Sequence, residues 1–214
     1  MQVLYLHGFA SSPQSSKATF FARKFAARGI TITVPDLNQP DFSTLTVSRM
    51  LRQVSELLAS STGPVCVVGS SLGGFVAVQA ARHHPDRVSR LVLLAPALDF
   101  DGQRLSELGD RGLEGWRSSN QLAVFHYGYG RMMPVHYDLY DDARRYNAFD
   151  ATLSQPVQIF QGRHDTSVEP RTVERWAATR PNVELHMLDD DHQLLKSLDA
   201  IWTEMERFLQ LTRG

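Results

Sequence analysis

Several features that would place a sequence in a particular class of protein are scarce or absent here. One of the 214 residues is cysteine, which excludes a disulfide within the chain, and Cys66 lies in an apolar run where a free thiol behaves as a small hydrophobic side chain. No apolar run approaches the roughly 20 residues of a membrane span. The N-terminus lacks the basic start and the small-residue cleavage site of a signal peptide. We therefore expect a cytoplasmic protein with no membrane span.

Charge of either sign is not concentrated anywhere along the chain. The formal net charge is -1, and the sequence has no block of like charges. This composition excludes the basic surface that nucleic-acid binding requires, so we expect a small-molecule partner and no nucleic acid. With 43% apolar residues the chain is long enough to bury one sizeable core, and we expect a single domain over residues 1–214.

Short apolar segments rich in β-branched residues alternate with stretches of helical period. This alternation predicts βαβ units, and therefore a mostly parallel sheet of about six strands with helices on both faces. The strands are expected at residues 3–6, 30–34, 65–68, 91–94, 157–160 and 183–187.

The helices have recognisable ends in the sequence. The first is expected at residues 16–28, closed by Gly29, and the second follows a cap at Ser43. A third spans residues 72–84, and the last has an apolar stripe that begins at Leu194.

Residues 99–152 break this rhythm, because they contain no strand and helix of normal length. A connection this long usually has structure or function of its own, so we expect an insertion after the fourth strand, with a hairpin turning at 127–130 and a short helix at 141–146. The insertion is either a cap or lid that binds acyl chains, or a segment that covers the domain core. Its larger apolar residues are Trp116, Leu122, Val124, Phe125, Tyr127, Tyr129, Met132 and Met133.

The segment GSSLG at residues 69–73 matches the pattern G-x-S-x-G. It follows an apolar strand and opens a helix, which is the context of a nucleophile elbow. The tight turn forces the central serine into a strained backbone conformation and needs small neighbours. Ser71 is therefore the candidate nucleophile. The alternative is a glycine-rich helix start that binds an anion or only packs.

A serine hydroxyl needs a base to remove its proton and an acid to orient that base. Asp165 and His192 follow the last two predicted strands, in the order expected after the serine. Both lie at the sheet end where open α/β folds build their sites. We assign His192 as the general base and Asp165 as the acid. Alternatively, Asp165 caps a turn and His192 only begins the final helix.

Two other arrangements use the same histidine. Asp189, Asp190 and Asp191 are rival acids, but loop neighbours rarely present a carboxylate to the far side of the ring. A metal site is the second arrangement, although its four residues lack any familiar ligand spacing. That site would consist of His164, Asp165, His186 and His192.

Acyl transfer also requires two N–H donors for the developing oxyanion. Leu72, directly after the nucleophile, supplies the first, and Phe9, in the loop after the first strand, is the expected second. His7 is expected to fix that loop by hydrogen bonding and not to act on the substrate.

The segments YLHGF at 5–9, SSP at 11–13, SKA at 16–18 and GSSLGG at 69–74 resemble the small YqiA-like esterases of the α/β-hydrolase superfamily. The resemblance implies an α/β-hydrolase fold that lacks the first two strands of the full superfamily pattern.

The segment QGRHDTSV at 161–168 is similar to the acid loop of that superfamily. It departs from the usual loop at Gln161, where histidine is common, and at Glu169 before Pro170. Neither residue is expected to touch the three catalytic candidates.

These observations predict a carboxylesterase or thioesterase that acts on a small acyl ester or thioester through an acyl-enzyme intermediate. No cofactor and no metal is required for this chemistry. An acyltransferase or a peptidase on the same fold is the first alternative, and a non-catalytic binding module is the second.

Overall fold

The computed structural model describes residues 1–100 and 108–211. Six strands form one parallel sheet in the order β2-β1-β3-β4-β7-β8. Their bounds are Gln2–Leu6 for β1, Ile32–Thr33 for β2, Val65–Ser70 for β3, Val88–Leu94 for β4, Val157–Gly162 for β7 and Val183–Leu188 for β8. All six predicted strands are present, which confirms the predicted α/β class.

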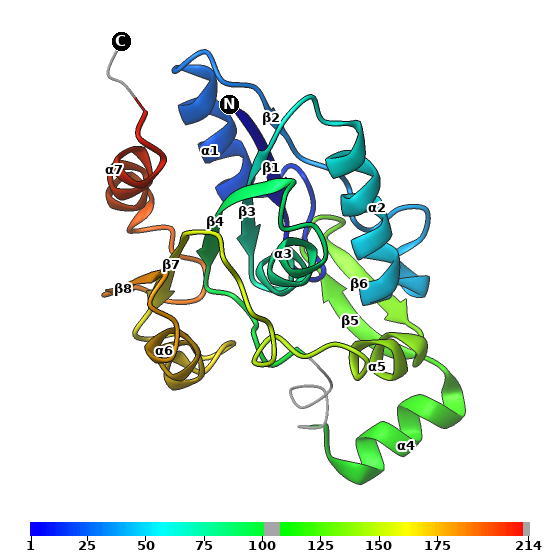
Figure 1. The fold of residues 1–214 in the computed structure, drawn as a ribbon. Coiled ribbons are helices and arrows are strands. Elements are labelled where there is room, and N and C mark those ends of the chain that lie inside the picture. Colours follow the sequence, from blue (N-terminus) through cyan, green and yellow to red (C-terminus); the bar gives the residue numbers. More distant parts are fainter. Residues whose placement is uncertain (101–107, 212–214) are drawn as a thin grey trace.

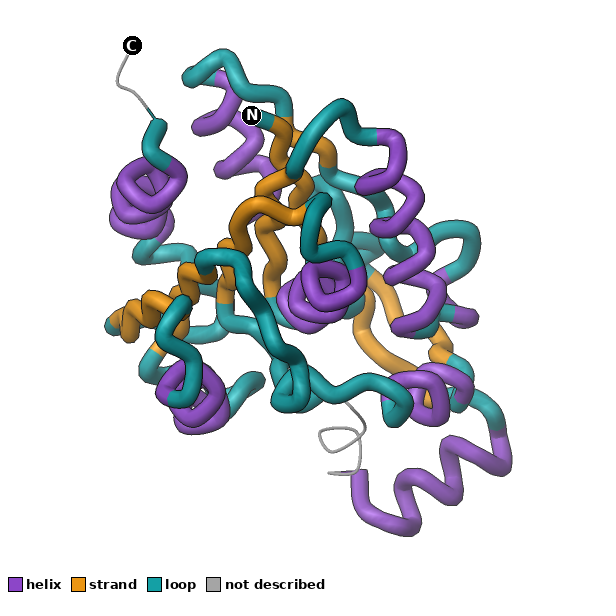
Figure 2. The backbone as a smooth tube through the Cα atoms, in the orientation of Figure 1, coloured by secondary structure: helices purple, strands orange, loops and turns teal. Residues whose placement is uncertain are grey.

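Helices cover both faces of this sheet (Figures 1 and 2). Alternate strand residues point to opposite faces, so the sheet separates two apolar clusters. On one face, α1 (Ser16–Ala26) and α7 (Leu198–Leu209) pack against the sheet. On the other face lie α2 (Val47–Ser60), α3 (Leu72–His83) and α6 (Pro170–Ala178).

Two predicted helix starts were wrong. Helix α2 is capped by Thr46, whose side chain accepts the Arg49 N–H at 3.1 Å, whereas Ser43 belongs to the short 3-10 helix η1 (Phe42–Thr44). The last helix begins at Leu198, because Leu194 has a φ of 55° and cannot continue a right-handed helix.

The predicted insertion after the fourth strand contains two helices and a hairpin, and its residues 101–107 lie outside the described residues. Strands β5 (Leu122–His126) and β6 (Arg131–Val135) pair antiparallel around a turn at 127–130, as predicted. The short helix α5 is at Asp138–Ala143 and not at 141–146.

Helix α4 (Gly109–Ser119) was not predicted, and it stands out from the body of the molecule (Figure 1). Its glycines weaken the helical signal. Trp116 anchors it, since the buried indole donates to the carbonyl of Val135 at 2.8 Å. Trp116 thus packs in the core.

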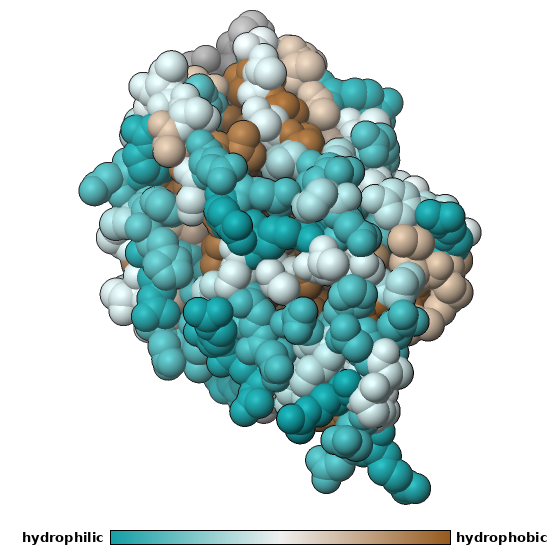
Figure 3. All heavy atoms as spheres, turned by 90° about the vertical axis from the view of Figure 1, so that its right-hand side faces the viewer, coloured by the Kyte–Doolittle hydropathy of each residue, from teal (hydrophilic) through white to brown (hydrophobic). Residues whose placement is uncertain are grey.

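The face shown in Figure 3 is largely hydrophilic, with small groups of hydrophobic residues near its top and right-hand edge. Within residues 1–100 and 108–211, none of the helices has both the length and the apolar character to cross a bilayer.

Candidate active site

Ser71 stands between β3 and α3 in the conformation expected of a nucleophile elbow. Its φ is 52° and its ψ is -118°, a region that non-glycine residues rarely occupy. Gly73 permits the turn, because a Cβ there would clash with the backbone of Leu6. The Ser71 N–H still donates to the carbonyl of Leu94 at 2.9 Å, so the neighbouring strand holds the strained residue in place.

The structure brings Ser71, His192 and Asp165 into one hydrogen-bonded chain. Ser71 Oγ lies 3.2 Å from Nε2 of His192, and Nδ1 of the same ring lies 2.8 Å from Oδ2 of Asp165. A carboxylate can only accept, so Nδ1 is the protonated nitrogen and Nε2 is free to accept the serine proton.

Asp165 is held as an ionised group. Its side chain is fully buried, and Oδ1 accepts the N–H groups of Ser167 and Val168, each at 2.8 Å. Burial is the largest influence and would raise the pKa of Asp165, but the hydrogen bonds from His192, Val168 and Gln161 together outweigh it and lower the pKa. The carboxylate therefore stays charged at neutral pH.

The expectation that Gln161 would not touch the candidate residues was wrong. Its Nε2 donates to Oδ2 of Asp165 at 2.9 Å, the same oxygen that binds His192. The side chain of Gln161 is buried at the end of β7, four residues before the carboxylate in a tight loop. Glu169, the second departure, only caps α6 through a 3.4 Å contact with the Arg171 N–H.

The carboxylates of the three rival acids interact with groups other than the His192 ring. Asp190 is buried and accepts the N–H groups of Asp191 at 2.8 Å and Ser197 at 3.0 Å. Asp189 lies 2.7 Å from His164, and the Asp191 carboxylate accepts the Gln193 N–H. Asp165 is therefore the carboxylate that meets the His192 ring.

The four residues of the metal alternative do not come together. His164 pairs with Asp189, and His186 pairs with Glu184 at 2.8 Å on the outer strand β8. Among the described residues, the group close enough to share a metal ion consists of Glu184, His186 and Glu204. Arg207 already hydrogen-bonds to both of those carboxylates.

The loop after β1 passes directly over the nucleophile. A Cβ on Gly8 would lie 3.2 Å from Cβ of Ser71, so only glycine allows this approach without displacement. Among the backbone hydrogen bonds of the described residues, none uses the N–H of Phe9 or of Leu72. Neither N–H group is thus committed to a backbone partner there.

His7 has the contacts of a loop-fixing residue, as expected. Its Nε2 accepts the Leu37 N–H at 3.0 Å, and its Nδ1 lies 2.9 Å from the Gly8 carbonyl. Burial is the main cause that lowers the pKa of His7, so the ring is neutral and donates to Gly8.

Lys17 also reaches the site, although the sequence reasoning did not single it out. Its Nζ donates to the backbone carbonyl of His192 at 3.2 Å, and the residue is only 8% exposed. The available signal was a lysine in the first turn of a helix whose positions 18, 21 and 25 are apolar.

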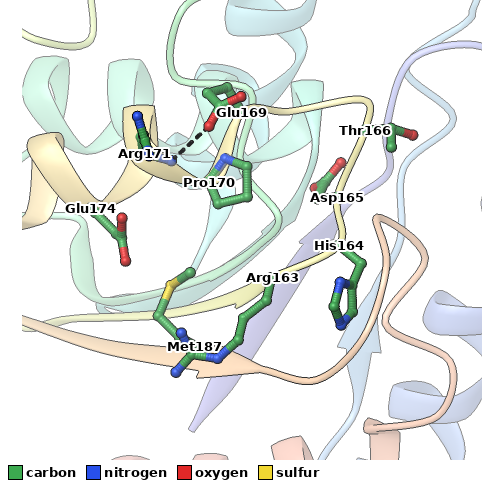
Figure 4. Close-up of a pocket in the computed structure, with 9 residues that line it drawn as sticks. All are labelled: Arg163, His164, Asp165, Thr166, Glu169, Pro170, Arg171, Glu174 and Met187. Carbon is green, nitrogen blue, oxygen red and sulfur yellow. Dashed lines mark hydrogen bonds between the residues drawn. The ribbon is translucent and has the colours of Figure 1, made fainter.

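A hollow of about 520 Å³ lies beside Asp165, between α6 and the ends of β7 and β8 (Figure 4). Neither Ser71 nor His192 lines it. Its lining is formed by Arg163, His164, Asp165, Thr166, Glu169, Pro170, Arg171, Glu174 and Met187.

Residues 2–210 match the model of a family described as Uncharacterised protein family (UPF0227). The chain belongs to this family. This match, with the α/β-hydrolase fold described below, confirms the resemblance to the YqiA-like members of the α/β-hydrolase superfamily.

One curated relative is the lipase LipV of Mycobacterium tuberculosis, 41% identical over 86 residues, which is 38% of this chain and 33% of that protein. Another is a pyrethroid hydrolase of Sphingobium wenxiniae, 33% identical over 82 residues, which is 36% of this chain and 29% of that protein. The matches thus span about a third of the length of these relatives.

Solved structures extend the likeness over nearly the whole chain. The mouse alpha/beta hydrolase domain-containing protein 10 superposes with a TM-score of 0.83 at 19% identity, covering 98% of this chain and 89% of that one. Est1E from Butyrivibrio proteoclasticus, with ferulic acid bound, has a TM-score of 0.83 at 16% identity, covering 98% of this chain and 88% of that one. At these identities the likeness shows the fold, which is that of the α/β hydrolases.

Proposed function

We propose that this protein is a serine hydrolase that cleaves carboxylic esters or thioesters of small acyl substrates. The observation that carries the proposal is the chain from Ser71 Oγ through the His192 ring to the buried Asp165 carboxylate, at 3.2 Å and 2.8 Å. A nucleophile, a base and an orienting acid in this order form the arrangement that acyl transfer requires.

In the proposed mechanism, Nε2 of His192 takes the Ser71 proton as Oγ attacks the carbonyl carbon. Asp165, which is ionised, stabilises the imidazolium that forms. The N–H groups of Phe9 and Leu72 donate to the oxyanion of the tetrahedral intermediate. His192 returns the proton to the leaving alcohol or thiol, leaving an acyl group on Ser71. A water activated by the same ring then releases the acid and regenerates the serine. The steps need neither a cofactor nor a metal.

The hairpin of β5 and β6 is our candidate for a cap over this site. Its Tyr127 N–H donates to the carbonyl of Ala10 at 2.8 Å, next to Phe9 in the loop that carries the second oxyanion donor. We regard the chain as one domain, with the segment after β4 as a cap that binds the acyl group. The alternative is a purely structural cover for the core.

The named relatives support the chemistry, since they include a lipase and a pyrethroid hydrolase.

A cytoplasmic location is also part of the proposal. Burial raises the pKa of the Cys66 thiol to about 12, so the thiol is protonated and unreactive. A chain whose one cysteine is a buried thiol suits the reducing cytoplasm.

The proposal is tested with a panel of esters and thioesters of graded acyl length. Ser71→Ala should lower kcat by a factor on the order of 10⁴ or more, because the three residues act as a unit. Ser70→Ala, which changes the adjacent buried hydroxyl, is the matched control and should retain activity.

Turnover by the parent protein should also survive EDTA. Normal turnover by purified Ser71→Ala protein would refute the proposal, and loss of activity in EDTA that zinc restores would favour a metal mechanism.

A further inference from the structure

One face of α1 is tied to the chain that follows β8. Lys17 donates to the carbonyl of His192, and Lys24 donates to Asp199 at 2.7 Å. Arg28 pairs with Glu206. Lys17 and Lys24 lie seven positions apart, so they share one side of the helix, and Arg28 follows the end of the helix. Only the first contact reaches the candidate active site.

Lys17 differs from the other two in its burial. Lys24 and Asp199 form an ordinary surface pair, since 35% of the Lys24 side chain and 83% of the Asp199 side chain are accessible to solvent. Lys17 is only 8% exposed. Removing an ammonium from water costs several kcal/mol unless hydrogen bonds and opposite charges offset it. A buried lysine at this position therefore needs a specific set of partners.

The charged groups that act on this ammonium are carboxylates from the loops after β7 and β8. They are Asp165, Asp191 and Asp190, and each favours the protonated lysine. Burial is nevertheless the largest influence and lowers the pKa of Lys17 to about 8. The ammonium is thus still the main form at neutral pH, and it faces the two loops that present the acid and the base.

We propose that Lys17 is a positioning residue for His192: its ammonium fixes the backbone carbonyl of His192 and so keeps the ring between Asp165 and Ser71. This inference rests on the proposed function. A ring displaced by a fraction of an ångström would lose its alignment with Ser71, and such misplacement is costly in rate.

Lys17 hydrogen-bonds to the backbone of His192 and not to its ring. Replacing Lys17 should therefore lower kcat and leave KM nearly constant. Replacing a lysine that only stabilised the fold would lower the melting temperature without lowering the kcat of the folded protein. These two readouts separate a positioning role from a structural one.

The test compares Lys17→Met, Lys17→Gln and Lys17→Arg with Lys24→Met, the matched loss of a lysine on the same face of α1. For a short-chain p-nitrophenyl ester, Lys17→Met should lower kcat by on the order of tenfold with KM within about twofold. Lys17→Arg, which keeps the cation and its donors, should recover much of this loss, and Lys24→Met should match the parent.

Parental kcat in folded Lys17→Met protein would overturn the inference. If that variant fails to fold, Lys17→Gln is held to the same criterion. A second measurement does not depend on turnover. The His192 ring resonance, assigned by its loss in His192→Ala, is recorded by NMR in the Ser71→Ala background with and without the lysine. An unchanged resonance there also overturns the inference, whereas an inactive parent with a displaced resonance refutes only the proposed function.

Discussion

At the scale of single residues, the carboxylates near His192 are distinguished by what each one accepts. Asp165 uses one oxygen for two backbone N–H groups and the other for His192 and Gln161. Both carboxylate oxygens of Asp190 accept hydrogen bonds from backbone N–H groups of its own loop. The first carboxylate is therefore the one that we propose for the chemistry, and the second holds the loop that carries His192.

Amide replacements should separate these roles. Asp165→Asn should lower kcat by a factor of about 10³ to 10⁴, because an amide does not stabilise the imidazolium. Asp190→Asn should keep kcat within a fewfold of the parent but lower the melting temperature, since an amide offers one acceptor where the loop needs two. Steady-state kinetics and thermal melts of both proteins check this, and the reverse ranking in kcat would mean that the acid was assigned wrongly.

Lys17 leads to a prediction about stability against pH. Burial is the main cause of its lowered pKa, about 8 in the folded protein against roughly 10.4 in an unfolded chain. Between these values the unfolded chain binds more protons, so Lys17 makes the free energy of unfolding rise with pH. Urea titrations should show the parent gaining about 3 kcal/mol relative to Lys17→Met between about pH 7 and pH 11. Cys66 and Tyr5 are present in both proteins and cancel in the comparison, and a constant difference would contradict the predicted pKa shift.

The sequence was sufficient to predict that Ser71, Asp165 and His192 lie together, because each follows a strand, and strand ends of a parallel sheet meet at one edge. Lys17 and Gln161 could not be found in this way. Lys17 is 175 positions from His192 in the chain, and its contact depends on how α1 packs. The sequence predicts that Gln161 is an interior residue of a strand. Only the geometry of the loop that follows this strand brings the amide of Gln161 and the Asp165 carboxylate together.

At the scale of elements, the six strands were predictable because each is a short apolar run between turn residues. Helix α4 was not, since three glycines within it weaken its helical propensity and a distant contact of Trp116 anchors it. The start of α7 was misplaced for a related reason. Leu194 fits the apolar period of the helix, but it is buried in a left-handed turn ahead of it.

The hairpin separates the cap hypothesis from its structural alternative. Phe125 and Met132 are cross-strand partners that are 47% and 56% exposed, whereas Val124 and Met133 form the next pair and pack on the core. Val124→Ala should lower the melting temperature, as expected for lost core contacts. Phe125→Ala and Met132→Ala should leave it unchanged.

If the hairpin binds acyl chains, Phe125→Ala, Met132→Ala and Tyr127→Ala should each change kcat/KM for long-chain esters by about tenfold, which corresponds to about 1.4 kcal/mol of pocket contact. The panel of graded acyl esters measures this directly, with Val124→Ala as the packing control. Three variants with the parental chain-length profile would show that the hairpin is structural.

At the scale of the whole molecule, the topology explains why three residues separated by up to 121 positions form one chain of hydrogen bonds. The parallel order places β3, β7 and β8 with their carboxyl ends at one edge, and the strands deliver Ser71, Asp165 and His192 there. The α/β-hydrolase fold of the related structures has the same architecture over nearly the whole chain. The position of the site thus follows from the fold, and its chemistry from the side chains at that edge.

The most direct test of the central claim is covalent labelling with a fluorophosphonate, which reacts with a serine only when a neighbouring base activates it. The account predicts one adduct on the parent protein, mapped by mass spectrometry to the peptide that contains Ser71. It further predicts no adduct on Ser71→Ala and labelling of His192→Ala slowed by a factor on the order of 10³ or more. An adduct on another residue, or labelling of Ser71→Ala at the parental rate, would contradict the account.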